Sequence, residues 1–226
     1  MRKNIPNALK KLSSHYDKLF EKYGRSFKTA QLSSRRSQEY RMRLMFENIQ
    51  LNKKSSVLDF GCGTAQLYKF LKKKKFEGKY LGIDISRKIV EFNKKEFIKN
   101  KNVKFLNINL ISSNSKLKTK FDYTVVSGTF NNNTGNNWIW MKKALKILFK
   151  LTKKTLIFNN LSTHVDYKEK NLFYVRPEKI FHFCKKNLSE FIIIRNDYSL
   201  KKNFLPYEFT TFVFKKKRMK KNDYKK

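Results

Sequence analysis

The segment SVLDFGCGTA, residues 56–65, constrains the fold of this chain most. It begins with apolar residues that predict a buried strand, and Asp59 stands at the end of that strand. Gly61 and Gly63 follow, and glycines allow a sharp backbone turn and the close approach of a ligand to the main chain. Thr64 is expected to cap the helix that comes next. The segment thus predicts a strand, a ligand-binding turn and a helix in succession.

A second strand with an acid at its end follows at residues 80–86, YLGIDIS. Asp84 comes 25 residues after Asp59, close to the ~20 residues that separate a nucleotide-binding glycine turn from its ribose-binding acid. A fixed carboxylate can accept hydrogen bonds from both ribose hydroxyls. Together the two segments predict a site for a nucleoside-containing ligand at the carboxyl ends of parallel strands.

Two other interpretations of the glycine turn are open. A dinucleotide-binding turn requires a third glycine or alanine where this chain has Gln66, and little chain remains for a separate substrate domain. An ordinary tight turn of an α/β protein that binds nothing is the second alternative.

The order of the apolar segments predicts an α/β fold with a Rossmann-like, mostly parallel seven-stranded sheet and an antiparallel last strand. We expect residues 1–52 to form an N-terminal helical extension, residues 53–215 the ligand-binding domain and residues 216–226 a basic tail. Expected helices span residues 5–23, 34–49, 65–73, 86–99, 138–151 and 177–187, and expected strands span residues 56–60, 79–84, 103–107, 121–127, 155–159, 190–196 and 208–214.

The net charge of +36 arises from 53 Lys and Arg against 17 Asp and Glu. One interpretation is a nucleic-acid or anionic-membrane partner. The other is biased composition, because Lys, Asn, Ile, Phe and Tyr share AT-rich codons and are all abundant here. Either way, weak and non-specific binding of RNA at low salt is expected.

Cysteine, histidine and hydropathy narrow the class of protein. The two cysteines, Cys62 and Cys184, cannot form a disulfide framework, and no Cys/His cluster has the spacing of a metal site. No signal-peptide core and no apolar run of membrane-spanning length occurs. We therefore expect a metal-free protein of the cytoplasm.

The strand that ends in Asp-x-Gly-x-Gly resembles motif I of the class I S-adenosylmethionine (SAM) methyltransferases. The resemblance implies SAM as cofactor, with Asp59, Gly61 and Gly63 beside its methionine part, Asp84 on the ribose and Ile85 on the adenine face. Two positions depart from the family pattern. Asn109 replaces the Asp that contacts the adenine amine, and Ala65 replaces the last glycine of motif I; neither change removes a group that binding requires.

Four further segments narrow the resemblance to a largely uncharacterised bacterial group of these enzymes. They are SSRRSQEYR at 33–41, SGTFN at 127–131, FNNLS at 158–162 and YEFT at 207–210. Ser127 is expected beside the cofactor. Tyr16 and the segment that contains Arg41 are expected to cover SAM, with the Arg41 guanidinium pairing with the methionine carboxylate.

The acceptor is predicted to be a small molecule, methylated on oxygen or nitrogen. Asn131 and Asn159 are expected to face its pocket, and His164 is the loop histidine placed to act as a general base. An RNA methyltransferase is one alternative, suggested by the charge. The SGTF segment argues against it, because enzymes that act on exocyclic base amines generally have Asp/Asn/Ser-Pro-Pro-aromatic at that place. A catalytically silent SAM-fold protein that binds an anionic partner is the other.

Overall fold

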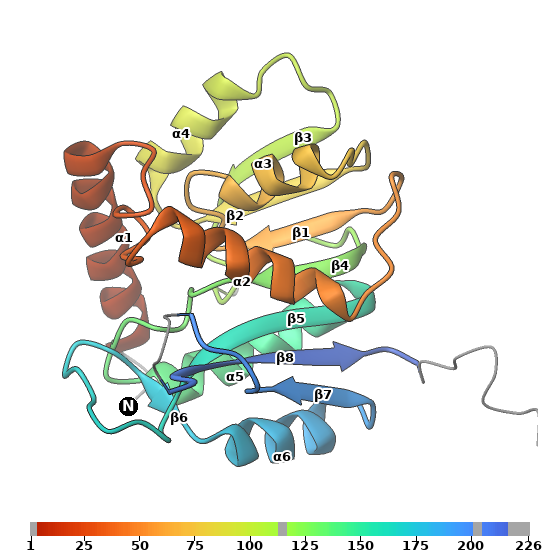
Figure 1. The fold of residues 1–226 in the computed structure, drawn as a ribbon. Helices are drawn as coiled ribbons and strands as arrows, with labels where there is room; N and C mark the ends of the chain where they lie inside the picture. Colours follow the sequence, from red (N-terminus) through yellow and green to blue (C-terminus); the bar gives the residue numbers. More distant parts are fainter. Residues whose placement is uncertain (1–3, 113–116, 201–204, 217–226) are drawn as a thin grey trace, which may run out of the picture.

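A computed structural model describes residues 4–112, 117–200 and 205–216 (Figure 1). The centre is one sheet in the order β3-β2-β1-β4-β5-β8-β7, with the short β6 paired to β5. All pairs are parallel except those of β8, which runs antiparallel to both β5 and β7. The strands are β1 (Val57–Phe60), β2 (Tyr80–Asp84), β3 (Val103–Asn107), β4 (Phe121–Val126), β5 (Thr152–Ser162), β6 (Tyr174–Val175), β7 (Ile192–Arg195) and β8 (Glu208–Phe214).

Helices cover both faces of the sheet, and the central parallel strands β1, β2 and β4 are accordingly buried along nearly their whole length. One core joins α2, α3 and α4 to the sheet, and a second joins α5 and α6 to the opposite face. The helices are α1 (Asn4–Tyr23), α2 (Arg35–Glu47), α3 (Gln66–Lys73), α4 (Arg87–Glu96), α5 (Asn137–Lys150) and α6 (Pro177–Asn187).

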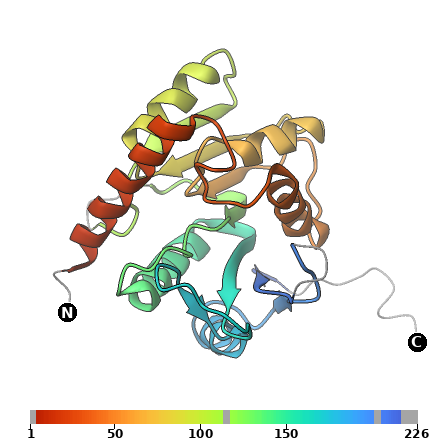
Figure 2. The same ribbon diagram turned by 60° about the vertical axis from the view of Figure 1, so that its left-hand side comes forward.

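Helix α1 stands across the edge of the sheet at which the parallel strands end (Figures 1 and 2). It packs against α4, where Phe20 meets Phe92 with ring centroids 5.1 Å apart and Lys88 pairs with Glu21. Ser13 on α1 also donates a hydrogen bond to the carbonyl oxygen of Ile85, just after β2. The predicted helical extension therefore reaches the place where a ligand is expected.

The predicted Rossmann-like architecture and the antiparallel pairing of the last two strands are confirmed. Strand β5 is longer than expected, and β6 was not predicted because two residues carry no periodic signal. The expectation that Thr64 caps α3 is wrong. The N-cap is Ala65, in the left-handed region at φ 55°, and it makes no side-chain cap.

The predicted basic tail, residues 216–226, lies outside the described residues except for Lys216. Within the described ranges, no helix combines the length and apolar character needed to cross a membrane.

Candidate functional site

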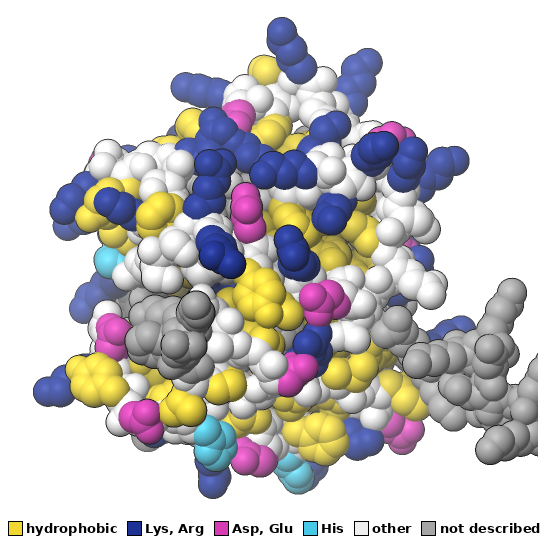
Figure 3. Space-filling view, viewed as in Figure 1, with side chains coloured by type: hydrophobic (Ala, Val, Ile, Leu, Met, Phe, Trp, Pro, Cys, Tyr) yellow, Lys and Arg dark blue, Asp and Glu magenta, His cyan; other side chains and the backbone are white. Residues whose placement is uncertain are grey.

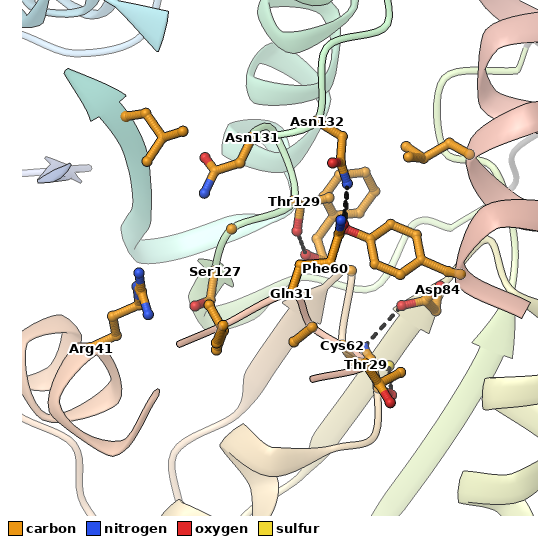
Figure 4. A pocket seen from close by; sticks show the side chains of 18 of the residues that line it. Thr29, Gln31, Arg41, Phe60, Cys62, Asp84, Ser127, Thr129, Asn131 and Asn132 are labelled. Atoms are coloured by element: carbon orange, nitrogen blue, oxygen red, sulfur yellow. Dashed lines mark hydrogen bonds between the residues drawn. The ribbon is translucent and has the colours of Figure 1, made fainter. Parts of the chain in front are cut away.

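A cavity of about 640 Å³ lies at the carboxyl ends of the parallel strands (Figure 4). The glycine turn after β1, the ends of β2 and β4, the N-terminal helices and the segment around Tyr207 all contribute to its wall. In parallel α/β sheets this edge is where ligands bind, because the strand order reverses there and leaves a crevice.

The glycine turn approaches the cavity with bare backbone. Gly61 has φ 75°, and a Cβ atom there would lie 2.3 Å from Thr129 Oγ1, so no larger residue fits. Thr129 holds this contact by donating a hydrogen bond to the carbonyl oxygen of Phe60 at 2.9 Å. Gly63 has φ 49° with open space around it. The predicted close approach of a ligand is therefore sterically possible at Gly63.

Asp84, predicted to bind ribose, lines the cavity and also holds the glycine turn in place. Its Oδ2 accepts a hydrogen bond from the Gly63 amide at 2.9 Å, and its Oδ1 accepts one from the Ser86 amide at 2.9 Å. The side chain is buried, and burial raises the pKa of this carboxyl group against the lowering effect of these amides. Asp84 therefore serves folding as well as any ligand.

Asp59 lies beneath the same turn and lines the cavity. Burial raises its pKa to about 7, and nearby Asp84 adds to this effect. The hydroxyl of Tyr80 opposes the shift by donating a hydrogen bond to Asp59 Oδ2 at 2.5 Å. In the described part of the chain, neither Asp59 nor Asp84 has a lysine or arginine partner. Two buried carboxylates without a counterion favour a cationic ligand.

The rim of the cavity is closed by a contact between three distant segments. Asn132, after β4, donates hydrogen bonds from Nδ2 to the hydroxyl of Tyr16 at 2.7 Å and to Gln31 Oε1 at 3.0 Å. Figure 4 shows Asn132 and Gln31 on the same side of the cavity. Burial raises the pKa of Tyr16, which keeps its hydroxyl neutral. Tyr16 therefore lines the cavity at this rim, and its role in covering SAM stays a prediction.

The remaining predicted cofactor residues also line the cavity. Ile85 and Asn109 lie on the side of β2 and β3, and Ser127 lies at the end of β4. Asn109 Oδ1 accepts a hydrogen bond from the amide of Ile111 at 3.0 Å, which fixes the direction of the side chain. That oxygen keeps a second lone pair for a donor in the cavity.

Arg41 lines the cavity from α2, but it is bound to the protein on one edge. Its Nε donates hydrogen bonds to both carboxylate oxygens of Glu208, at 2.9 and 3.2 Å, and its Nη2 lies 3.5 Å from the Tyr207 hydroxyl. Burial would lower the pKa of Arg41, but the attraction of Glu208 outweighs it and the pKa is raised. Arg41 Nη1 is buried without a hydrogen-bond partner among the described residues.

The two asparagines predicted to face an acceptor differ in position. Asn131 lines the cavity, and its Oδ1 is buried with no partner in the described chain. Asn159 does not line it. Its Oδ1 accepts a hydrogen bond from the Gly128 amide at 2.7 Å, so it supports the turn that carries Asn131. The expectation for Asn159 is corrected: the residue supports the cavity wall from behind.

The structure also contradicts the expected position of His164. Its side chain is 60% exposed, and its Nε2 lies 3.2 Å from Glu178 Oε1 at the start of α6. The chain reaches the cavity only at the next residues, Val165 and Asp166. His164 therefore has no place in the site as a general base.

Sequence reasoning missed several residues of the site. Tyr80, Gln31, Asn132 and Glu208 act through contacts between segments 21 to 167 residues apart. Tyr80 and Glu208 lie in the quoted segments YLGIDIS and YEFT, but neither segment indicates the contact that the side chain makes. Within the described residues, no cluster of His, Cys, Asp and Glu could hold a metal ion.

Comparisons with known proteins agree with this geometry. Residues 51–205 match the model of a family described as "Methyltransferase domain". The chain is 28% identical over 166 residues to "Putative methyltransferase Rv1506c" of Mycobacterium tuberculosis, a match that covers 71% of this chain and 93% of that protein.

Two solved methyltransferase structures are similar to this chain in fold. Magnesium protoporphyrin IX methyltransferase (ChlM) from Synechocystis PCC 6803, solved with bound SAH, is 13% identical, with a TM-score of 0.59 over 90% of this chain and 93% of that one. The methyltransferase domain of bacterial-CtHen1-C is 18% identical, with a TM-score of 0.61 over 78% of this chain and 98% of that one. At these identities the likeness concerns the fold.

Proposed function

The chain belongs to the methyltransferase domain family and is a class I SAM-dependent methyltransferase, and we propose that it methylates an oxygen or nitrogen atom of a small-molecule acceptor.

We assign the cofactor site to the end of the cavity near β1 and β2. Asp84 would accept hydrogen bonds from the ribose hydroxyls, Ile85 would pack on the adenine, and Asn109 would accept a hydrogen bond from the adenine amine. Asp59 would lie near the methionine part, where its charge favours a ligand that carries a sulfonium and an ammonium group. Tyr16 would cover this end together with Asn132.

The methionine end of the cofactor would lie toward α2 and β4. Ser127 lines this part of the cavity, and Arg41 Nη1 lacks a hydrogen-bond partner among the residues that the structure describes. A carboxylate placed between them would therefore find hydrogen-bond donors. The open space beside Gly63 would give the methionine part of the cofactor room to pass.

SAM supplies a methyl group on a sulfonium sulfur, from which transfer to a nucleophile is intrinsically favourable. The protein therefore needs mainly to hold the acceptor atom in line with the methyl carbon and the sulfur, and to exclude water. Asn131 Oδ1 is a buried acceptor that can fix a hydroxyl or amine of the acceptor molecule. His164 lies outside the cavity and is not available as a base. An acidic acceptor would not need one, because it would lose its proton to solvent.

The proposal of a small acceptor rests on the residues that line the cavity. Among the described residues, none that line it is a lysine, although the chain has 53 Lys and Arg. Its only described arginine, Arg41, is paired with Glu208 and is assigned above to the methionine end of the cofactor. The acceptor end is mainly apolar and aromatic, lined by Leu161, Leu172, Tyr174 and Tyr207. Such a wall suits a small organic molecule and disfavours a phosphate backbone, which binds to lysine and arginine.

The test is to incubate the protein with methyl-labelled SAM and a cell extract, then to separate small molecules, protein and nucleic acid. Label in the small-molecule fraction is expected, and it should fall with Asp84→Ala at a SAM concentration that does not saturate the variant. Label in RNA would overturn the small-molecule proposal in favour of the nucleic-acid alternative. Tight SAM binding without any transfer would favour the catalytically silent alternative.

A further inference from the structure

Tyr207 of the YEFT segment lines the cavity, whereas Glu208, at the start of β8, does not. Glu208 in this segment is 1% exposed and lies 167 residues from Arg41 in sequence, yet both of its carboxylate oxygens bind the Nε of that arginine. Tyr207, from the same segment, lies beside Nη2. Both residues therefore act on one edge of the guanidinium.

Because Glu208 and Tyr207 both contact the Nε–Nη2 edge of Arg41, the remaining nitrogen, Nη1, has no hydrogen-bond partner among the described residues. Nε and Nη2 lie on the same side of the planar guanidinium, whereas Nη1 lies on the other. The Arg41 side chain is only 8% exposed, and its Nη1 is buried without a partner among the described residues. A buried, charged donor left unsatisfied costs free energy, so its retention on a cavity wall indicates a ligand atom that accepts from it.

Both partners are held rigidly enough to aim this donor. Ser34 caps α2 by accepting a hydrogen bond from the Ser37 amide at 3.0 Å, and Arg41 lies on the buried face of that helix. Glu208 is held by the sheet, where it lies opposite Leu161 of β5 in the antiparallel register. Asn196 Nδ2 also donates a hydrogen bond to the carbonyl oxygen of Glu208 at 2.9 Å. The guanidinium cannot rotate without breaking its contacts to Glu208.

We propose that Glu208, assisted by Tyr207, is a positioning residue that presents Arg41 Nη1 to the carboxylate of the SAM methionine. This inference rests on the proposed SAM site. It gives the YEFT segment a function. Glu208, on the last strand, sets the preference of the cofactor site for a carboxylate although it does not itself contact the cofactor. A carboxylate on the acceptor molecule is the competing source of the same chemistry.

The experiment measures the binding of SAM and of decarboxylated SAM by calorimetry. The wild-type protein should prefer SAM by about 10-fold or more, the scale of one charge-assisted hydrogen bond. Glu208→Gln should weaken SAM binding to a similar extent and leave decarboxylated SAM within about 2-fold. Tyr207→Phe should have the same effect with a smaller magnitude.

Removing one member of a buried ion pair can prevent folding, so a second variant is needed. The double variant Arg41→Met/Glu208→Leu removes both charges together and should fold, with its preference for SAM lost. Asp197→Asn is the matched control, because it breaks an arginine–carboxylate pair with Arg195 away from the cavity lining and should leave both affinities unchanged.

Three results separate the possibilities. Equal weakening of both ligands by the Glu208 variants would mean a purely structural role and would overturn the proposal. Equal binding of SAM and decarboxylated SAM by the wild-type protein would also overturn the proposal. Arg41 Nη1 would then be assigned to another carboxylate, such as one on the acceptor. Failure of the wild-type protein to bind SAM at all would instead contradict the proposed function.

Discussion

Asp59 and Asp84 show how single residues couple folding to function in this protein. Each is a buried carboxylate at the end of a strand, and burial raises the pKa of both. Hydrogen bonds from two backbone amides oppose the rise in the pKa of Asp84, whereas among the described residues the Tyr80 hydroxyl alone donates a hydrogen bond to Asp59. Asp59 is therefore the residue at which ligand binding should respond to pH.

The first prediction concerns that response. Because the pKa of Asp59 is raised to about 7, the carboxyl group is neutral below that pH and charged above it. SAM affinity should therefore rise as the pH is increased from 6 to 8, measured by calorimetry at constant ionic strength. Tyr80→Phe removes a hydrogen bond that lowers the pKa, so it should move the midpoint to higher pH.

Asp59→Asn is the control for this pH profile, because any titration of SAM itself persists in that variant. The difference between the wild-type and Asp59→Asn profiles is the quantity to compare. Identical profiles would show that Asp59 does not titrate in the binding reaction.

The second prediction concerns Asp84. Asp84→Ala should weaken SAM binding by about 1.5–3 kcal/mol, the scale of hydrogen bonds to a charged group. It should also lower the free energy of unfolding measured with urea, because the amides of Gly63 and Ser86 lose their acceptor. Weakened binding at unchanged stability would mean that the two backbone contacts contribute nothing to the fold.

At the scale of the elements, one side chain links helix α1 to the N-terminus of α4. Ser86 joins α1 to the sheet domain: its Oγ accepts a hydrogen bond from the Ile89 amide, as the N-cap of α4, and donates one to Asp17 Oδ1 at 2.5 Å. One hydroxyl therefore serves both a cap and a contact between helices.

The third prediction follows from that double role. Ser86→Ala and Ser34→Ala each remove a helix cap and should each cost about 1 kcal/mol in the free energy of unfolding. Only Ser86→Ala should also increase hydrogen exchange in residues 4–23, since Ser34 caps α2 and makes no contact with Asp17. Equal exchange in the two variants would mean that α1 is held by its other contacts.

At the scale of the whole molecule, charge is distributed unevenly between surface and cavity. Figure 3 shows Lys and Arg side chains gathered over the part of this face that carries α3 and α4. Within the described chain, the cavity lining has no lysine. The positive charge therefore belongs to the exterior, and the carboxylates Asp59 and Asp84 belong to the site.

The fourth prediction is that polyanions bind the exterior only. RNA affinity, measured by fluorescence anisotropy, should be independent of sequence and fall steeply with salt concentration, because it arises from counterion release. Truncation after Lys216 removes further basic residues and should weaken RNA binding while SAM affinity is unchanged. Displacement of RNA by SAM would instead place RNA in the cavity and favour the nucleic-acid alternative.

The sequence by itself determined the strand–turn–helix at residues 56–65, the acid at the end of the next strand and the antiparallel ending of the sheet. These features are local, because hydrophobic periodicity and glycine positions depend on neighbours in the chain. Asp84, Ile85 and Asn131 could be placed at the cavity for the same reason, since the carboxyl ends of parallel strands meet at one edge.

Only the tertiary structure decided which of the predicted residues reach the cavity and what their side chains bind. It turned His164 toward Glu178, placed Asn159 behind the turn at Gly128, and engaged Arg41 with Glu208. These outcomes depend on contacts between residues that are distant in the sequence. No local pattern records such a contact, because its free energy comes from burial and from the partner that folding brings near.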